Sequence, residues 1–108
     1  MAGMLYLVPT PIGNLGDISE RARETLERAD FIAAEDTRVS LKLLNHLGLK
    51  KPLVSYYEHN KSFKGEKILD RILAGETCAL VSDAGSPAIS DPGEDLVKQC
   101  AAAGITVC

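Results

Sequence analysis

The chain has 108 residues, of which 45% are hydrophobic and only 5% aromatic, so it can fill one aliphatic core and suits a single domain. No apolar run approaches the roughly 20 residues that a membrane-spanning helix needs, and the N-terminus lacks the basic and apolar regions of a secretory signal. We therefore expect a cytoplasmic protein with no membrane partner.

Charge is unevenly distributed along the chain. The net charge is −3, which argues against a general nucleic-acid binder. The segment 38–71, however, holds eight basic and three acidic residues, so it carries +5 while the remainder carries −8. This local excess of basic side chains suits contact with a polyanion, although ordinary solvated helix faces would give the same pattern.

Five short apolar runs alternate with four amphipathic segments. The runs are continuous rather than alternating, which is typical of strands that are covered on both faces. They occupy residues 4–8, 31–34, 53–56, 78–81 and 105–108.

The first two amphipathic segments carry recognisable helix signals. Asp17 and Glu20 can form a capping box before the first helix. Ser40 can cap a second helix, which we expect to stop at Gly48.

The last two segments are bounded in the same way. The third helix is expected over 64–74, before Gly75. Asp91 is expected to cap the fourth helix, with Pro92 at its first position and Gly104 at its end. The side chains expected to face inward from the four helices are Ile18, Ala22, Leu26 and Ala29; Leu43, Leu44 and Leu47; Ile68, Leu69, Ile72 and Leu73; and Leu96, Val97, Cys100 and Ala101.

This alternation predicts an α/β fold with a mainly parallel five-stranded sheet and helices on both faces. The fifth apolar run ends the sequence at Cys108 with no helix after it. We therefore interpret residues 4–108 as one α/β domain at the N-terminus of a longer protein, whose C-terminal domain is absent.

The three cysteines, Cys78, Cys100 and Cys108, stand in apolar surroundings, and no pair has metal-ligand spacing. We expect buried, reduced thiols and no metal site.

Polar residues follow each of the first four apolar runs. The segments read PTPIGNLGD, EDTR, YEHN and SDAGSPAISDPG. In a parallel sheet the carboxyl ends of the strands share one edge, where ligands bind, so we expect these segments to converge on one rim. His46 instead falls inside the second helix and is expected at the surface.

The first and fourth segments favour a ligand without phosphates. Pro9 and Pro11 remove two backbone N–H donors of the kind that a phosphate cradle uses. Gly85 allows close backbone approach, and Asp83 and Ser86 supply small polar groups without positive charge. Such a lining suits the ribose and adenine of a zwitterionic or cationic cofactor, but a rigid strand-to-helix turn would explain the first segment equally well.

The second and third segments carry the groups capable of acid–base chemistry. Glu35, Asp36 and Arg38 form a self-satisfied ion-pair turn in the simplest interpretation. His59 is either an exposed or structural histidine or a general base, and Tyr57 can stack on a nucleobase.

Four sequence motifs carry a resemblance to a known family: LYLVPTPIGNLGDIS, AAEDTR, YYEHN and LVSDAGSPAISDPG. Together they resemble the tetrapyrrole-methylase-like, class III methyltransferases. Within that group they are most similar to the N-terminal domain of the enzymes that modify small-subunit ribosomal RNA. The resemblance covers the chain from Met4. It implies a homodimer of two-domain subunits that binds S-adenosyl-L-methionine between the domains. It also implies 2'-O-methylation of a cytidine ribose in the decoding centre of 16S rRNA, and a fragment that is inactive alone.

The same resemblance implies which residues bind the cofactor. They would be Pro11, Ile12, Asp83, Ala84, Gly85, Ser86 and Ile89. Relatives that methylate tetrapyrroles often have Gly-Asp-Pro where this chain has Gly85-Ser86-Pro87, so the contact that Ser86 makes stays open.

Methyl transfer from a sulfonium requires in-line positioning and a water-poor cleft, and a ribose hydroxyl profits from a base that takes its proton. The candidate bases are His59, Glu35 and Asp36, unless the absent domain supplies the base. The candidate substrate-binding residues are Arg38, Tyr57, Asn60, Lys61 and Lys64.

Two other functions fit the same sequence. C-methylation of a tetrapyrrole, such as uroporphyrinogen or a precorrin, would use the same fold and cofactor, with the basic segment meeting substrate carboxylates. A nucleotide-sensing or scaffold domain would use the fold without catalysis. Assays with both substrates distinguish the first alternative, and calorimetry with S-adenosylhomocysteine distinguishes the second.

Overall fold

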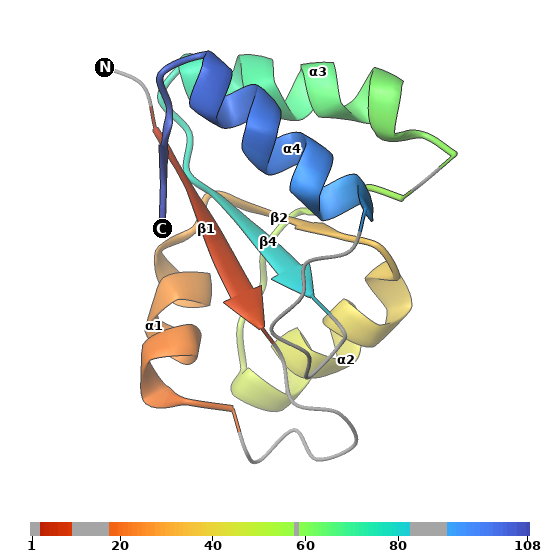
Figure 1. Ribbon diagram of the computed structural model, residues 1–108. Coiled ribbons are helices and arrows are strands. Elements are labelled where there is room, and N and C mark those ends of the chain that lie inside the picture. Colours follow the sequence, from red (N-terminus) through yellow and green to blue (C-terminus); the bar gives the residue numbers. More distant parts are fainter. Residues whose placement is uncertain (1–2, 10–17, 58, 83–90) are drawn as a thin grey trace.

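A computed structural model describes residues 3–9, 18–57, 59–82 and 91–108 (Figure 1). Strands and helices alternate along the chain, as predicted. The elements are β1 (Met4–Pro9), α1 (Glu20–Arg28), β2 (Phe31–Ala34), α2 (Thr37–Leu47), β3 (Leu53–Ser55), α3 (Lys61–Leu73), β4 (Cys78–Ser82), α4 (Asp91–Ala102) and β5 (Thr106–Val107).

The five strands form one parallel sheet in the order β3-β2-β4-β1-β5. The register pairs Pro9 of β1 with Ser82 of β4, and Ala34 of β2 with both Val81 and Ser55. The carboxyl ends of β1, β2, β3 and β4 therefore lie along one edge of the sheet. This edge is the rim that the sequence predicted.

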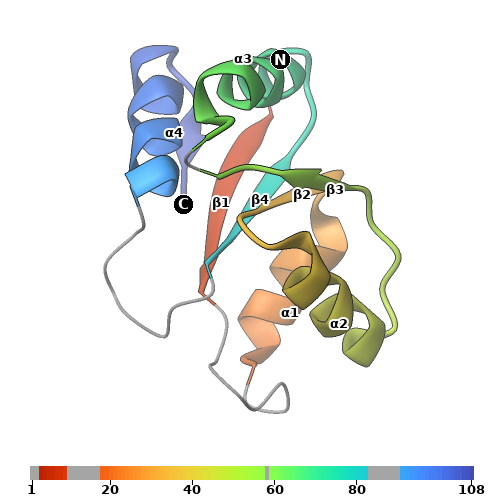
Figure 2. The same cartoon turned by 90° about the vertical axis from the view of Figure 1, so that its right-hand side faces the viewer.

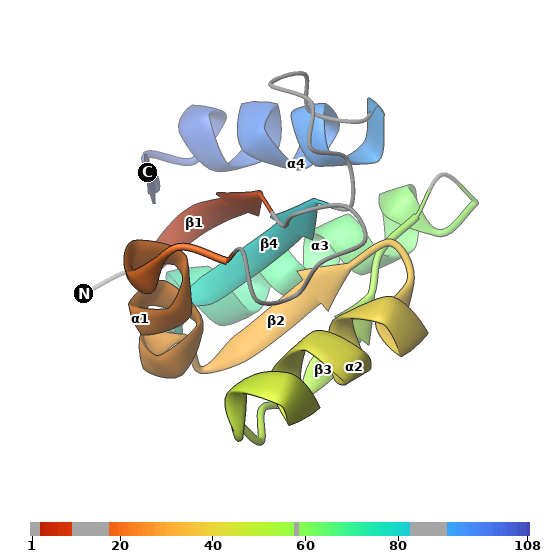
Figure 3. The same cartoon turned by 90° about the horizontal axis from the view of Figure 1, so that it is seen from below.

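Helices cover both faces of the sheet, two to a face. Helices α3 and α4 pack on the face that carries Leu5, Ala33 and Leu80. Helices α1 and α2 pack on the face that carries Ile32 and Val81. Figure 1 shows α3 and α4 above the sheet with α1 and α2 below it, and Figure 3 shows the same layers from the α1–α2 side. Because successive strand residues point to opposite faces, both sets must be apolar, which explains the continuous runs.

The first two helices begin at other residues than predicted. The side chain of Ser19 caps α1 by accepting a hydrogen bond from the N–H of Ala22 at 3.1 Å. Glu20 is then the first helical residue rather than the third, so the predicted capping box is wrong, and its partner Asp17 lies outside the described residues. Asp36, not Ser40, caps α2. It comes two residues after the end of β2, and its carboxylate accepts from the N–H of Arg38 at 3.0 Å.

The predicted core needs correction on the outer flanks of the helices. Ser40 is 1% exposed inside α2, whereas Leu73 at the end of α3 is 46% exposed and Ala101 in α4 is also exposed. The neighbouring residues Ile72 and Cys100 are both 0% exposed, so Leu73 and Ala101 lie on the outward side of their helices rather than beyond the core. Cys108 is exposed rather than buried, while Cys78 and Cys100 are buried as expected.

The C-terminal end of α2 lies where the sequence predicted it, whereas the starts of α3 and α4 differ from the prediction. Gly48 ends α2 in the left-handed conformation, at φ 71°, as its position predicted. Helix α3 begins at Lys61, three residues before the predicted start, and α4 includes Asp91 as its first residue instead of using it as a preceding cap.

Candidate active site at the carboxyl edge of the sheet

The ends of β1 and β4 mark the point where neighbouring strands connect to opposite faces of the sheet. Pro9 and Ser82 are register partners, so the two strands end side by side. The chain then runs from β1 to α1 on one face of the sheet and from β4 to α4 on the other face (Figure 1). Neighbouring strands whose connections part to opposite faces form the crevice in which open α/β sheets bind ligands.

The seven predicted cofactor residues belong to the two connections that leave this crevice. Pro11, Ile12, Asp83, Ala84, Gly85, Ser86 and Ile89 all lie outside the described residues. The register fixes the last described residues before them, Pro9 and Ser82, at adjacent points of the rim. The contacts of the seven side chains stay predictions.

The candidate bases follow the neighbouring pair of strands. Ala34 and Ser55 are register partners at the ends of β2 and β3, and the N–H of Tyr56 donates to the carbonyl of Ala34 at 2.9 Å. Glu35 and His59, which come after these two strands, are both exposed. The structure thus brings the connection that carries Glu35 beside the one that carries His59.

Asp36 has a structural task in addition to its candidate role. Its Oδ1 accepts from the backbone N–H of Arg38 at 3.0 Å and from the Nε of the same residue at 3.4 Å. The hydrogen bond from the Arg38 side chain, followed by the one from its backbone, holds the pKa of Asp36 below its ordinary value. A carboxylate of lowered pKa is a weaker proton acceptor, so this environment favours capping over general-base catalysis.

Asn60 fixes the connection between β3 and α3. Its Oδ1 accepts from the N–H of Tyr57 at 2.7 Å, and its Nδ2 donates to the carbonyl of Ser55 at 3.1 Å. Its backbone N–H also donates to the carbonyl of Tyr57 at 3.0 Å. Both ends of the side-chain amide are therefore engaged within the loop, which favours a positioning role over direct contact with a substrate.

The loop held by Asn60 presents two rings. The rings of Tyr57 and His59 meet edge to face, with centroids 6.3 Å apart and planes inclined at 67°. Tyr57 is 39% exposed, so part of its ring is available to a ligand. An exposed aromatic side chain beside a histidine suits stacking on a nucleobase next to a proton acceptor.

Two of the candidate substrate-binding cations share one groove. Arg38 and Lys64 come from α2 and α3, which lie on opposite faces of the sheet, yet both line a groove of about 450 Å³ at the β3 edge. The other lining residues are Thr37, Leu41, Leu53, Val54 and Ser55. Lys61, the first residue of α3, is not among them.

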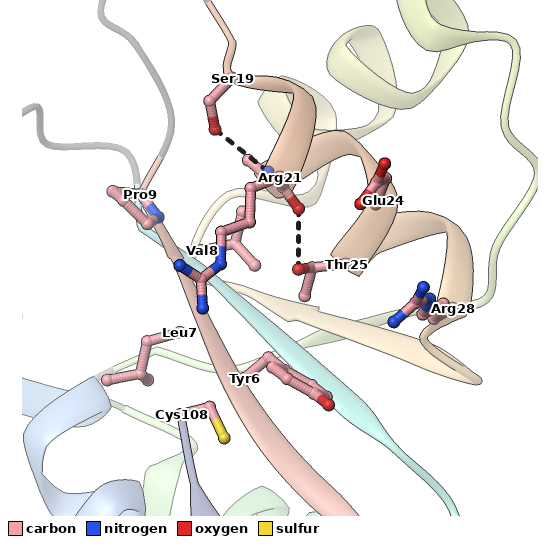
Figure 4. Close-up of a pocket in the computed structure, with 11 residues that line it drawn as sticks. Tyr6, Leu7, Val8, Pro9, Ser19, Arg21, Glu24, Thr25, Arg28 and Cys108 are labelled. Carbon is pink, nitrogen blue, oxygen red and sulfur yellow. Dashed lines mark hydrogen bonds between the residues drawn. The ribbon is translucent and has the colours of Figure 1, made fainter.

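A cavity of about 570 Å³, which the sequence did not predict, lies between α1 and β1 (Figure 4). The hydroxyls of Ser19 and Thr25 in its lining are already bonded to the α1 backbone. Arg21, whose side chain extends from α1 toward β1 in Figure 4, brings a cation to the cavity. The amphipathic pattern of the helix gave no signal for it, because an arginine at that position looks solvated.

The part of the chain that the structure describes forms neither a metal-binding cluster nor a membrane-spanning helix. Within it, no three His, Cys, Asp or Glu side chains are grouped so as to hold a metal ion. Nor does any described helix have the length and apolar content to cross a membrane.

A doubly wound parallel sheet, whose neighbouring strands β1 and β4 connect to opposite faces, places the chain in the class of open α/β domains. Solved structures share the architecture. Diphthine synthase superimposes with a TM-score of 0.74 at 16% identity, over 97% of this chain and 42% of that one. The uroporphyrin III C-methyl transferase of Thermus thermophilus superimposes with a TM-score of 0.72 at 20% identity, over 97% of this chain and 46% of that one.

The sequence identifies the family. Residues 4–108 match the model of the tetrapyrrole (corrin/porphyrin) methylases, and the chain belongs to that family. It is 58% identical, over 97% of its length, to ribosomal RNA small subunit methyltransferase I of Halalkalibacterium halodurans. It is 54% identical, again over 97% of its length, to the protein of the same name from Synechocystis. The chain spans 36% and 38% of the lengths of these two proteins.

Proposed function

We propose that the full-length protein transfers a methyl group from S-adenosyl-L-methionine to the 2'-hydroxyl of a cytidine ribose in 16S rRNA. The observation that carries the proposal is the identity of 58% and 54% to two proteins named as small-subunit ribosomal RNA methyltransferases. The chain would be the N-terminal domain of a cytoplasmic homodimer, and its partner would be the small ribosomal subunit.

The residues at the crevice between β1 and β4 fit this cofactor chemically. The sequence from 83 to 90, ahead of α4, contains no Lys or Arg, and S-adenosyl-L-methionine carries no phosphate that would need one. Pro11 and Ile12 from one side and Asp83, Ala84, Gly85, Ser86 and Ile89 from the other would hold it. When bound, S-adenosyl-L-methionine would supply an electrophilic methyl carbon for the ribose oxygen.

The chain's own residues would bind and orient the ribose. We assign His59 as the leading candidate to take the proton of the 2'-hydroxyl, with Glu35 as second, because both follow strands that end side by side and neither has its side chain engaged in a described hydrogen bond. Tyr57 would stack on the cytosine or its neighbour. Asp36 would keep α2 in place, and Asn60 would hold the loop that presents Tyr57 and His59.

The alternative of tetrapyrrole methylation rests on the fold of the uroporphyrin methyltransferase, which at 20% identity shows architecture alone. Methyl transfer by the full-length protein from labelled S-adenosyl-L-methionine separates the two substrates. We expect label in 16S rRNA of unmodified 30S subunits, located by nuclease digestion on a cytidine ribose, and no label in uroporphyrinogen III. Label in uroporphyrinogen III and none in RNA would overturn the proposal.

A scaffold function is tested by calorimetry of the same protein with S-adenosylhomocysteine. We expect saturable binding with one site per subunit. Absence of binding together with absence of methyl transfer would favour a domain without catalytic function.

A further inference from the structure

The groove that contains Arg38 and Lys64 runs around the open edge of the sheet. β3 is the terminal strand on this side, and Figure 2 shows it at the margin of the sheet with α2 and α3 on either side. The groove is lined from α2 by Thr37, Arg38 and Leu41, from β3 by Leu53, Val54 and Ser55, and from α3 by Lys64.

The ladder between β2 and β3 directs part of the β3 backbone into this groove. The N–H of Ile32 donates to the carbonyl of Pro52, and the N–H of Tyr56 donates to the carbonyl of Ala34. Since the amides of alternate residues point to opposite sides of a strand, those of Leu53 and Ser55 point away from β2. The carbonyl of Ser55 accepts from the side-chain amide of Asn60, so the backbone of these two residues leaves two N–H donors and the carbonyl of Leu53 at the open edge.

The groove is also cationic and lacks acidic lining. The side chain of Arg38 is 90% exposed, and its contact with Asp36, at 3.4 Å, leaves most of its guanidinium donors unused. Lys64 lines the same groove from α3, and Thr37 and Ser55 contribute hydroxyl-bearing side chains to the lining. Guanidinium, ammonium, hydroxyl and backbone N–H groups are the donors that proteins direct at nucleic-acid phosphates.

We propose that this groove binds the sugar–phosphate backbone of the substrate RNA. The inference rests on the proposed function and deepens it by naming the surface that carries the strand to the active site. Ser55 belongs both to the groove and to the rim, where it is the register partner of Ala34 just before Glu35. A strand held along the groove therefore leads directly to the connections that carry Glu35 and His59.

A second copy of the chain fits this edge less well. In a symmetric dimer the same patch would face itself, so Arg38 and Lys64 would meet the same cations of the other copy. β3 offers only three residues, Leu53–Ser55, for pairing between edges. A polyanion would neutralise the positive charges of Arg38 and Lys64, whereas the same cations of another copy would repel them.

The test uses the full-length protein with Arg38→Gln and Lys64→Gln combined. The matched control combines Arg23→Gln and Lys50→Gln, which removes one exposed arginine and one exposed lysine that do not line the groove. Circular-dichroism melting verifies that both variants fold. RNA affinity is measured by filter binding of a 16S rRNA fragment that contains the target region, at a series of salt concentrations.

We expect the groove variant to bind RNA about 10-fold or more weakly at 0.1 M salt, and the slope of log K against log salt to shrink by about 1.4, or about 0.7 for each lost contact to a single strand. The KM for RNA should rise, while kcat and the affinity for S-adenosylhomocysteine stay unchanged. The control should behave as the wild type does.

Wild-type affinity and slope in the groove variant would overturn the inference while leaving the proposed function intact. A change from dimer to monomer in light scattering, without loss of RNA affinity per subunit, would assign the groove to an interface between copies and would overturn it as well. If the wild type binds RNA but transfers no methyl group, the proposed function fails, and the groove is still judged by the binding of its variant.

Discussion

Pro9 and Ser82 are register partners at the ends of two neighbouring parallel strands, and the chain leaves them toward opposite faces of the sheet. The segments 10–17 and 83–90, whose residues are at least 66 positions apart in the sequence, thus follow two strand ends that lie side by side. Open α/β sheets bind ligands at such a point, so we expect two loops that are distant in the sequence to contribute to one site.

The assignment of His59 as the base predicts a large kinetic effect. His59→Gln in the full-length protein should lower kcat by about 100-fold or more, because the proton of the ribose hydroxyl loses its acceptor. Binding of S-adenosylhomocysteine should not change. His46→Gln is the matched control, since His46 is an exposed histidine of α2. A normal kcat in His59→Gln, with a loss in Glu35→Gln, would transfer the role to Glu35.

Asp36 is expected to act in stability rather than in proton transfer. Asp36→Asn retains an oxygen that can accept from the N–H of Arg38 but removes the charge, so most of the methyl transfer should persist. The lowered pKa of Asp36 means that its charge stabilises the fold at pH values above its ordinary pKa and that this contribution fades as the pH falls through the lowered value. Urea unfolding of wild type and variant should therefore differ at neutral pH and converge in acid. A collapse of kcat in a fully stable Asp36→Asn would identify it as the base.

Removal of the Asn60 side chain should loosen the loop between β3 and α3. Asn60→Ala deletes the hydrogen bonds to the N–H of Tyr57 and the carbonyl of Ser55, so the free energy of unfolding should fall by about 1–3 kcal/mol. The KM for RNA should rise as Tyr57 and His59 lose their fixed position. Asn45→Ala, at an exposed position of α2, should change stability by less than about 0.5 kcal/mol. Equal effects of the two substitutions would contradict a clamp at Asn60.

The buried cysteines should resist alkylation in the folded protein. Burial raises the pKa of the Cys78 thiol to about 12 and also raises the pKa of Cys100, so neither forms much thiolate at pH 8. Mass spectrometry after brief iodoacetamide treatment should show both unmodified, and both should react once guanidinium unfolds the chain. Rapid native labelling of Cys78 would show that the β4 region opens readily.

The sheet was predictable because its signal is local. Each strand is a short run of apolar residues, and the second run, Phe31–Ala34, matches β2 residue for residue. Parallel pairing follows from helices of sufficient length between the strands. The position of the four strand ends that precede the polar segments, along one rim, then follows from topology without knowledge of any side chain.

Finer features depended on tertiary contacts that no local pattern reports. Ser40 is of a residue type that often caps helices, but α2 already begins at Thr37. Asp36 is therefore its cap, two residues after the end of β2. Leu73 continues an apolar stripe, yet it is 46% exposed while its neighbour Ile72 is buried, so the helix turns Leu73 away from the sheet. The meeting of Arg38 and Lys64 requires the order of the strands, since they stand on helices on opposite faces of the sheet.

We propose that the connections after β1 and β4 together form one side of the cofactor site. Hydrogen–deuterium exchange of the full-length protein, with and without S-adenosylhomocysteine, is the decisive test. We expect protection in peptides that cover residues 9–18 and 82–91, and none in peptides from the opposite end of the sheet, such as 48–52 and 74–77. Protection confined to that opposite end, or present after only one of the two strands, would contradict it.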